Sequence, residues 1–466
     1  MTDHPATRSS LPRGVRPYDW ALRQMRVPAA HKVTRGSKDV IVAVIDLGYR
    51  FHPDHEGHLW SHPQRADLHG WDFADDDASL DYTGLHAADY YRDHHTFIVG
   101  EVAAVAPACP IMVLRVGYGA GEHESWARAV RYAADNGARV LVIPHGYIQG
   151  QAEYGEGLFY QGTDFAYPYD NPDLLEADDY AYAKGALIVK GVCDNRGRRV
   201  AATEIARPPV FAVGSTNRHG RPSGIAVNAD YVAAAAPGGD VFREDPREAV
   251  WGTGGAENYV PSIGGCMAAG FAGGTAALVL SRFPYLTPDQ LRQVLCNTAR
   301  GEGWTPLLGH GVLDAGRAVS LREEELAPAP AVLSQPARLD LRDGRAFLTL
   351  AVENRGAFDI RRALITLFTG DPARPASVCA RSGQPWALGT IQLGHVIVDN
   401  LAGFERAEVE IEIFNYAGRA SKQVWAEVAA LDLGAGPIAT RARLRPPDEG
   451  WDALAGIQAF STRKEV

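Results

Sequence analysis

The sequence predicts an α/β domain with a mostly parallel sheet flanked by helices, followed by an antiparallel β-sandwich. Early in the chain, continuous apolar runs such as residues 40–45 alternate with alanine-rich amphipathic stretches. This rhythm is typical of parallel strands buried between helices. A segment rich in Glu, Pro and Ala interrupts it at residues 323–334. Beyond that segment, apolar and polar residues alternate singly, as in strands with one face in water.

In chain order, we expect a flexible lead-in at residues 1–16 and the α/β domain at residues 17–322. Its strands are expected at 40–45, 111–116, 140–143 and 186–189, and its helices at 124–136 and 288–295. Thr287 is a good N-cap for the last helix, with Pro288 at its first position. Residues 148–179 show little period, which indicates either a solvated surface loop or a substrate loop.

The second half of the prediction begins with a linker at residues 323–334. A β-sandwich is expected at 335–446 and a tail at 447–466. Residues 338–352 alternate around Asp343-Gly344, the pattern of a hairpin with a two-residue turn. The strand rhythm is similar to that of immunoglobulin-like modules.

Composition limits the classes of function. The chain has 466 residues and a net charge of −10, which makes nucleic acid an unsuitable partner. Its five cysteines are widely spaced without a CxxC pair, which indicates a reducing compartment. We find no signal peptide and no membrane-spanning run, so we expect a cytoplasmic protein with no membrane partner, unless a leader has been removed.

Four separated segments carry the candidate chemistry. They are residues 42–48 (VAVIDLG), 94–100 (HHTFIVG), 186–197 (ALIVKGVCDNRG) and 264–270 (GGCMAAG). In this order they resemble the motifs of the subtilisin-like peptidases, or subtilases, and the likeness extends over roughly residues 17–319. Cys266 stands where that family carries its catalytic serine. The resemblance implies a subtilisin-like fold for the α/β domain.

The resemblance also implies a catalytic triad. Asp46 would orient His94, and His94 would deprotonate Cys266. A helix N-terminus beside a histidine favours the thiolate form of a cysteine. Taken singly, each residue has an ordinary alternative, namely a strand-end cap, a hydrogen-bonded polar histidine and a small core residue.

The oxyanion and substrate sides depend on the same resemblance. Aligned on Gly197, Asn195 matches the side-chain oxyanion donor, whereas a one-residue shift would put Asp194 there. The ordinary alternative for Asn195 is a turn residue. Pro144, His145 and Gly146 stand where the family has its substrate-pairing Ser-Leu-Gly.

Other departures surround the nucleophile. Gly265 replaces a threonine, His95 a glycine, and Phe97 and Phe271 replace histidines. Gly270 lies at the family's proline position, which predicts space for the larger sulfur. A thioester is attacked by amines in preference to water more strongly than an oxygen ester is. The pairing of Cys266 with Gly270 therefore indicates acyl transfer as well as hydrolysis.

Two further features have competing interpretations. Cys193 could serve a redox or resolving role, but we favour a small residue filling an alanine position. Residues 75–77 with Asp81 fit no defined calcium loop, so we favour a solvated acidic turn. We therefore expect no metal and no cofactor.

The leading hypothesis is a cysteine-dependent subtilase homologue that acts on a peptide or protein substrate by proteolysis or acyl transfer. The alternative is a catalytically inactive homologue that binds a peptide or protein partner. It is favoured by the altered segment at Pro144, by the added charge of Asp194 and by the lack of a recognisable propeptide before residue 17. A serine peptidase with one engineered change fits worst, because one change would not also supply Gly265, Gly270 and Asp194. The sequence leaves the oligomeric state open.

Overall fold

We analysed a computed structural model of the chain, which forms two compact units, Met1–Ser320 and Leu321–Val466. The structure describes residues 11–12, 15–80, 93–117, 123–144, 165–167, 172–192, 200–202, 207–226, 228–241, 244–255, 258–333, 335–343, 345–369, 391–413, 424–430 and 439–447. Among the helices in these ranges, none is long and apolar enough to cross a membrane.

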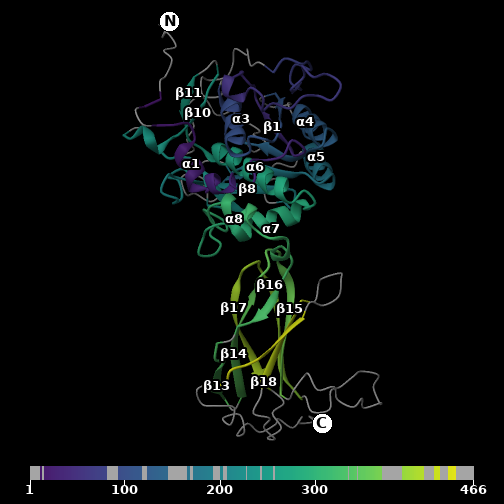
Figure 1. Ribbon diagram of the computed structural model, residues 1–466, viewed down its shortest axis with the longest axis vertical. Coiled ribbons are helices and arrows are strands. Elements are labelled where there is room, and N and C mark those ends of the chain that lie inside the picture. Colours follow the sequence, from purple (N-terminus) through teal and green to yellow (C-terminus); the bar gives the residue numbers. More distant parts are fainter. Residues whose placement is uncertain are drawn as a thin grey trace. The chain divides into compact units, whose positions relative to one another are not determined.

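A seven-stranded parallel sheet forms the centre of the first unit (Figure 1). In spatial order its strands are β2 (Gly70–Asp72), β3 (Ile111–Arg115), β1 (Ile41–Asp46), β4 (Ala138–Ile143), β6 (Leu187–Gly191), β8 (Val210–Thr216) and β9 (Ala234–Pro237). The strands are apolar on both faces because helices cover both sides. The predicted subtilisin-like parallel sheet is confirmed.

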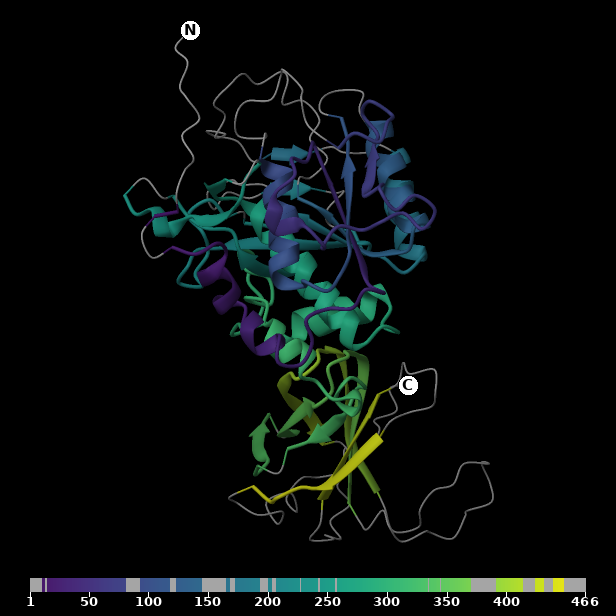
Figure 2. The same ribbon diagram turned by 45° about the horizontal axis from the view of Figure 1, so that its top comes forward.

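Two pairs of helices cover the two faces of this sheet (Figure 2). Leu141 and Ile143 of β4 share a core cluster with residues of α4 (His123–Asp135) and α5 (Pro172–Ala183). The side chain of Val142 points the other way and lies against Gly273 of α6 (Gly265–Arg282). α6 packs beside α3 (His94–Val105) on that face.

Shorter elements complete the first unit. They are α1 (Asp19–Gln24), α2 (Val27–Ala30), η1 (Pro53–His55), β5 (Phe165–Tyr167), β7 (Val200–Ala202), η3 (Pro246–Glu248), β10 (Val250–Thr253), β11 (Tyr259–Ser262), α7 (Pro288–Thr298) and α8 (Ala315–Val319). The predicted N-cap is confirmed, since Thr287 and Gln290 form a capping box at the start of α7.

One expectation for this unit needs correction. The sequence alone predicts irregular structure for residues 148–179, but helix α5 begins within that segment at Pro172. Proline is favoured at the first position of a helix, and Leu174, Ala177 and Ala181 bury one face of α5 at helical spacing. The earlier, aromatic-rich part lies mostly outside the described residues.

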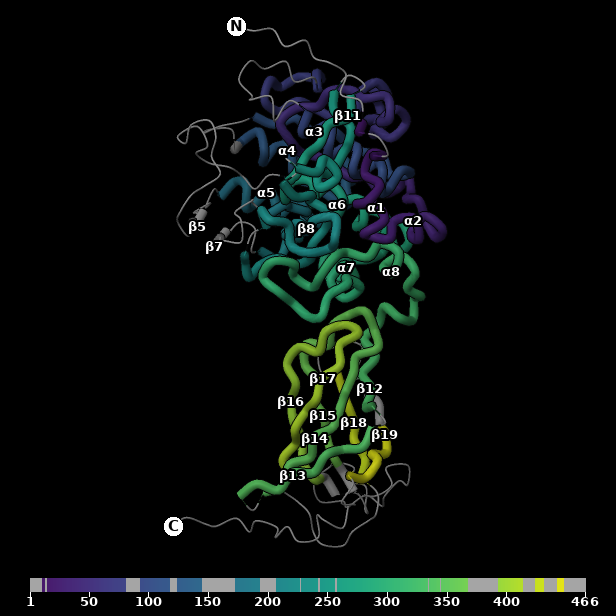
Figure 3. The backbone as a smooth tube through the Cα atoms, turned by 90° about the vertical axis from the view of Figure 1, so that its left-hand side faces the viewer, coloured from purple at the N-terminus to yellow at the C-terminus, as the bar shows by residue number. Residues whose placement is uncertain are grey.

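The second unit is an antiparallel β-sandwich (Figure 3). One sheet contains β12 (Pro330–Val332), β13 (Arg338–Arg342), β14 (Arg345–Asn354) and β17 (Arg406–Ile413). The other contains β16 (Ile391–Leu401), β15 (Ile360–Thr369), β18 (Val424–Ala430) and β19 (Ala439–Arg443). Asp343 has a positive φ of 51° between the paired residues Arg342 and Arg345, as the predicted hairpin requires.

The segment predicted as a linker contains regular structure. Residues Glu323–Glu325 form a 3₁₀ helix, η4, and β12 pairs with β14 at the edge of the first sheet. Proline is tolerated at the first residue of an edge strand, which accounts for a strand that begins at Pro330.

Candidate active site

The carboxylate of Asp46 lies at the carboxyl end of β1 and is fully buried. One oxygen accepts the backbone N–H of Leu47 at 2.8 Å. The other accepts Nδ1–H of His94 at 2.6 Å. A carboxylate at Nδ1 fixes the tautomer in which Nε2 is the basic nitrogen. The structure thus brings together the first two residues of the predicted triad.

The first turn of α3 is attached to β1 and its exit loop at successive residues. After His94, the Nε2–H of His95 donates to the carbonyl of Val44 at 3.2 Å. The hydroxyl of Thr96 bonds both the N–H and the carbonyl of Arg50, each at 2.9 Å. Before His94, Asp93 accepts from the Arg50 guanidinium at 3.2 Å. These bonds fix the orientation of the His94 ring.

The first turn of α6 carries Cys266 and is held by close backbone contacts. Gly264, its N-cap, has φ 152° and ψ 161°, a conformation essentially restricted to glycine. A Cβ at Gly265 would overlap the carbonyl oxygen of Val192, just beyond β6. This close approach leaves room only for glycine at position 265. A Cβ at Gly191 would lie 2.8 Å from the carbonyl oxygen of Pro144, which places that backbone beside the same junction.

Helices α3 and α6 run parallel and in register. A Cβ at Gly270 would overlap Oε2 of Glu101, and one at Gly274 would lie 2.6 Å from the Cβ of Val105. Val105 lies one turn after Glu101 in α3, and Gly274 lies one turn after Gly270 in α6, so the two helices run in the same direction. Continued one turn toward the N-termini, this register brings the turn that carries Cys266 alongside the first turn of α3.

The region around Gly270 differs from the expectation. The sequence alone predicts that a glycine here leaves space for the sulfur of Cys266. In the structure, that space holds the side chain of Glu101, whose Cβ and Cδ lie 3.0 and 3.1 Å from a Cβ built on Gly270. Cys266 itself is partly exposed and is not in a disulfide.

A buried polar network that the sequence did not reveal lies beneath α3. The hydroxyls of Tyr18 and Thr253 are 2.9 Å apart, and His55 bonds Thr253 at 3.0 Å and Tyr49 at 3.0 Å. Burial and neighbouring histidines lower the pKa of His55 to about 3, so the ring is neutral. The hydroxyl of Thr253 also donates to the carbonyl of Thr96, two residues after His94. The network thus supports helix α3, which carries His94.

Several predicted site residues lie outside the described part of the chain. They are Asn195, Asp194, Cys193, His145 and Gly146. β6 ends at Gly191, four residues before Asn195, so the oxyanion assignment stays a prediction. Of the predicted substrate segment, the structure describes Pro144, which is buried just after β4.

Two arginines pair with acidic residues at and just after the end of β2. Arg115 pairs with Asp72 and Asp75, and Arg128 pairs with Asp76 at 2.6 Å. The hydrogen bond from Arg128 lowers the pKa of Asp76. These contacts connect the turn to β3 and α4. Asp81 lies outside the described residues, and within those described no group of His, Cys, Asp and Glu could hold a metal.

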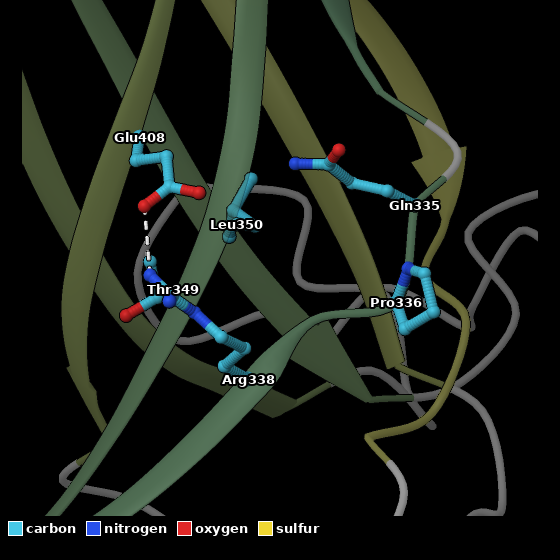
Figure 4. A pocket seen from close by; sticks show the side chains of 6 residues that line it. All are labelled: Gln335, Pro336, Arg338, Thr349, Leu350 and Glu408. Atoms are coloured by element: carbon cyan, nitrogen blue, oxygen red, sulfur yellow. Dashed lines mark hydrogen bonds and ion pairs between the residues drawn. The ribbon is translucent and has the colours of Figure 1, made fainter.

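A shallow pocket of about 240 Å³ lies on the β-sandwich (Figure 4). Its lining residues are Gln335, Pro336, Arg338, Thr349, Leu350 and Glu408. Arg338 and Glu408 pair with each other across it at 2.7 Å, and both side chains are well exposed. The carboxylate of this pocket, Glu408, is paired with Arg338, so we place the candidate chemistry at α3 and α6.

Comparisons with known proteins agree with this geometry. A sequence model of the subtilase family matches residues 37–311. Mycosin-4 of Mycobacterium tuberculosis is 31% identical over 342 residues, covering 64% of this chain and 69% of mycosin-4. The crystal structure of a lanthipeptide protease matches with a TM-score of 0.52 at 22% identity, over 65% of this chain and 93% of that one. The epidermin leader peptide processing serine protease of Staphylococcus aureus matches with a TM-score of 0.51 at 17% identity, over 69% and 84%.

Proposed function

The chain belongs to the subtilase family of peptidases, and we propose that it processes peptides through a thioester on Cys266. The observation that carries this proposal is the buried 2.6 Å hydrogen bond between Asp46 and His94. This hydrogen bond leaves Nε2 of His94 as the basic nitrogen. His94 lies in the first turn of α3, and the register of α3 and α6 brings that turn toward Cys266.

In the proposed mechanism, His94 takes the proton of the Cys266 thiol and the sulfur attacks the carbonyl carbon of the substrate. The carbon–nitrogen bond breaks as His94 returns the proton to the leaving amine. The resulting thioester is then attacked by water or by a second amine, from which His94 removes a proton. The carbon–sulfur bond breaks, and Cys266 is regenerated with its proton.

Two groups are proposed to stabilise the negative oxygen that forms during both attacks. One is the backbone N–H at the start of α6, where the helix dipole also favours negative charge. The other is the side chain of Asn195. We further propose that the segment from Pro144 to Gly146 contacts the substrate, because the Pro144 backbone lies beside Gly191 and hence near the start of α6.

A peptide with a defined cleavage point is the proposed substrate. The name of one structural relative describes a lanthipeptide protease and that of another a leader peptide processing protease. Transfer to an amine would join or cyclise such a peptide, whereas attack by water would release it. The thioester on Cys266 is the branch point between the two outcomes.

The test is to incubate the protein with a peptide library, with and without an added amine, and to identify products by mass. Cys266→Ala and Cys266→Ser variants are run in parallel. We expect hydrolysis products or amine adducts that disappear with Cys266→Ala. The serine variant should lower the ratio of amine adduct to hydrolysis product, because an oxygen ester discriminates less in favour of amines.

Two outcomes would contradict the proposal. Products that survive Cys266→Ala would exclude this nucleophile. Peptides that bind equally to the parent and to Cys266→Ala without turnover would instead favour a binding protein. The rate of Cys266 alkylation against pH separates the cases further, since a thiol without enhanced reactivity at neutral pH has no activating base.

A further inference from the structure

Glu101 is a buried acid in the middle of helix α3. Its side chain is fully buried, and within the described residues neither carboxyl oxygen has a hydrogen-bond partner. Burial of this kind penalises the charged form and raises the pKa of Glu101 well above its ordinary value.

The Glu101 carboxyl fills the space that Gly270 leaves open on α6. A Cβ at position 270 would overlap Oε2 of Glu101, so any larger residue at 270 would displace the acid or the helix. Glu101 lies two turns after His94 on one face of α3, and Gly270 lies one turn after Cys266 on α6. The contact therefore lies one turn from Cys266 on α6 and two turns from His94 on α3.

The surroundings of Glu101 are rigid and aromatic. The ring of Tyr18 packs edge-on against Phe97 of α3 and Phe271 of α6, with ring centres 5.7 and 6.0 Å apart. Burial raises the pKa of the Tyr18 hydroxyl above its ordinary value. Packed protein interiors deform little, so the volume of the Glu101 side chain affects the distance between α3 and α6.

We propose that Glu101 is a positioning residue for the nucleophile, because its side chain, packed against Gly270, sets how closely α6 packs against α3. The separation of Cys266 from His94 follows from that spacing. This inference rests on the proposed function of Cys266, but it makes a separate claim about Glu101 and Gly270. A displacement of about 1 Å in a catalytic group can cost on the order of a hundredfold in rate.

The test is a double-mutant cycle with Glu101→Ala, Gly270→Ala and the combined variant, together with the isosteric Glu101→Gln. The first measurement is the rate of Cys266 alkylation by iodoacetamide from pH 6 to 9, identified on the Cys266 peptide by mass. We expect Gly270→Ala to change this rate about tenfold or more and to shift its pH profile, as a displaced base would. The combined variant should return to within about threefold of the parent. Glu101→Gln should keep the parent profile, and Glu101→Ala should not.

Gly274→Ala is the matched control, because it crowds Val105 one turn farther from Cys266. Glu101→Ala should not rescue it. If Gly270→Ala fails to fold, the combined variant is compared with Glu101→Ala alone. A combined profile that returns toward the parent supports the inference, and one equal to that of Glu101→Ala would overturn it. An unchanged effect of Gly270→Ala in the Glu101→Ala background would overturn it.

The outcomes also separate this inference from the proposed function. The parent protein could form no product while its Cys266 alkylation follows the expected double-mutant cycle. That result would contradict the proposed activity and support the role of Glu101. If the parent protein forms product at a rate that Glu101→Ala does not change, the proposed activity is supported and the role of Glu101 is contradicted.

Discussion

Polar side chains occupy opposite environments in the two units of the chain. The first unit buries Asp46, His94 and Glu101 completely or nearly so, along with an ion pair between Lys190 and Asp178. In the second unit, arginines and glutamates form an exposed ladder along β13, β14 and β17, over an apolar core. Among the acids that the structure describes there, Glu353 is the most buried, and it lies between Arg355 and Arg406.

The difference indicates that the first unit contains buried ionisable groups that lower its stability. Burying a carboxyl or an ammonium costs several kcal/mol unless partners compensate for the lost hydration. Exposed ion pairs are worth about 0–1 kcal/mol and cost little to keep. The first unit therefore carries groups that a purely structural domain would leave in water. Substitutions of buried groups in the first unit should therefore have larger effects than substitutions of exposed pairs in the second. The predictions follow from the largest expected effect to the smallest.

Asp46→Asn should abolish most of the proposed activity. The amide cannot hold His94 in the tautomer that makes Nε2 basic, and the corresponding loss in triad enzymes is about 10⁴-fold in rate. The measurement is kcat on whichever peptide the library identifies. Thermal unfolding is the control and should change little, because the amide oxygen still accepts the N–H of Leu47. Activity within tenfold of the parent would exclude Asp46 from the triad.

Lys190→Met should destabilise the first unit strongly. Lys190 and Asp178 are both fully buried and 2.9 Å apart, so the substitution leaves a buried carboxylate without its cation. We expect a loss of about 3–5 kcal/mol in the free energy of unfolding, measured in urea. Lys190→Met combined with Asp178→Leu should recover most of it. Failure of the second change to compensate would show that the pair is not coupled.

Acid should weaken the first unit through His55. Its folded pKa of about 3 lies below the unfolded value of about 6.5, so the unfolded chain binds the additional proton between these values. Stability due to this group is present above pH 6.5 and is lost as the pH falls toward 3, by up to about 1.4 kcal/mol per pH unit. His55→Gln should flatten that slope in urea unfolding between pH 7 and 4. Equal slopes would contradict a neutral, buried ring.

Glu101 should make the free energy of unfolding depend on pH in the opposite direction, with stability falling as the pH rises. Its folded pKa is raised, so the folded chain keeps a proton that the unfolded chain releases above pH 4.5. Stability due to this group therefore falls as the pH rises from 4.5 toward the folded pKa. Glu101→Gln should be more stable than the parent at pH 8, with little difference at pH 4. A difference that does not change with pH would mean that Glu101 is charged in the folded state.

The exposed ladder should give the smallest effect. Arg338→Gln removes a pair whose side chains are 70% and 60% exposed, and we expect a change below about 1 kcal/mol. The measurement is urea unfolding, with Lys190→Met as the contrasting buried case. A loss comparable to that of Lys190→Met would erase the distinction between the two units.

The elements were predictable from the sequence where local pattern decides structure. Continuous apolar runs identified the central strands, Thr287 identified the start of α7, and Asp343 identified a hairpin. Asp46 and His94 were predictable as a pair through the order of the motifs. Their hydrogen bond required both the end of β1 and the start of α3 to be in place.

The buried acid and the buried ion pair were not predictable. Glutamate in a helix is ordinarily exposed, and α3 is buried along almost its whole length, so its pattern marks no solvent face on which Glu101 would stand out. Asp178 and Lys190 lie on different elements, and α5 was not expected from the irregular composition around it. In each case the partner is set by tertiary packing rather than by spacing along the chain.

The register of α3 and α6 also has a consequence for the order of folding. The two helices join segments that are far apart in the chain, and such long-range contacts form late and slowly. During synthesis from the N-terminus, Asp46 and His94 emerge well before Cys266. A ribosome-bound chain that ends before α6 contains Asp46 and His94 but lacks Cys266. The activity that we propose for Cys266 can therefore begin only when the domain is nearly complete.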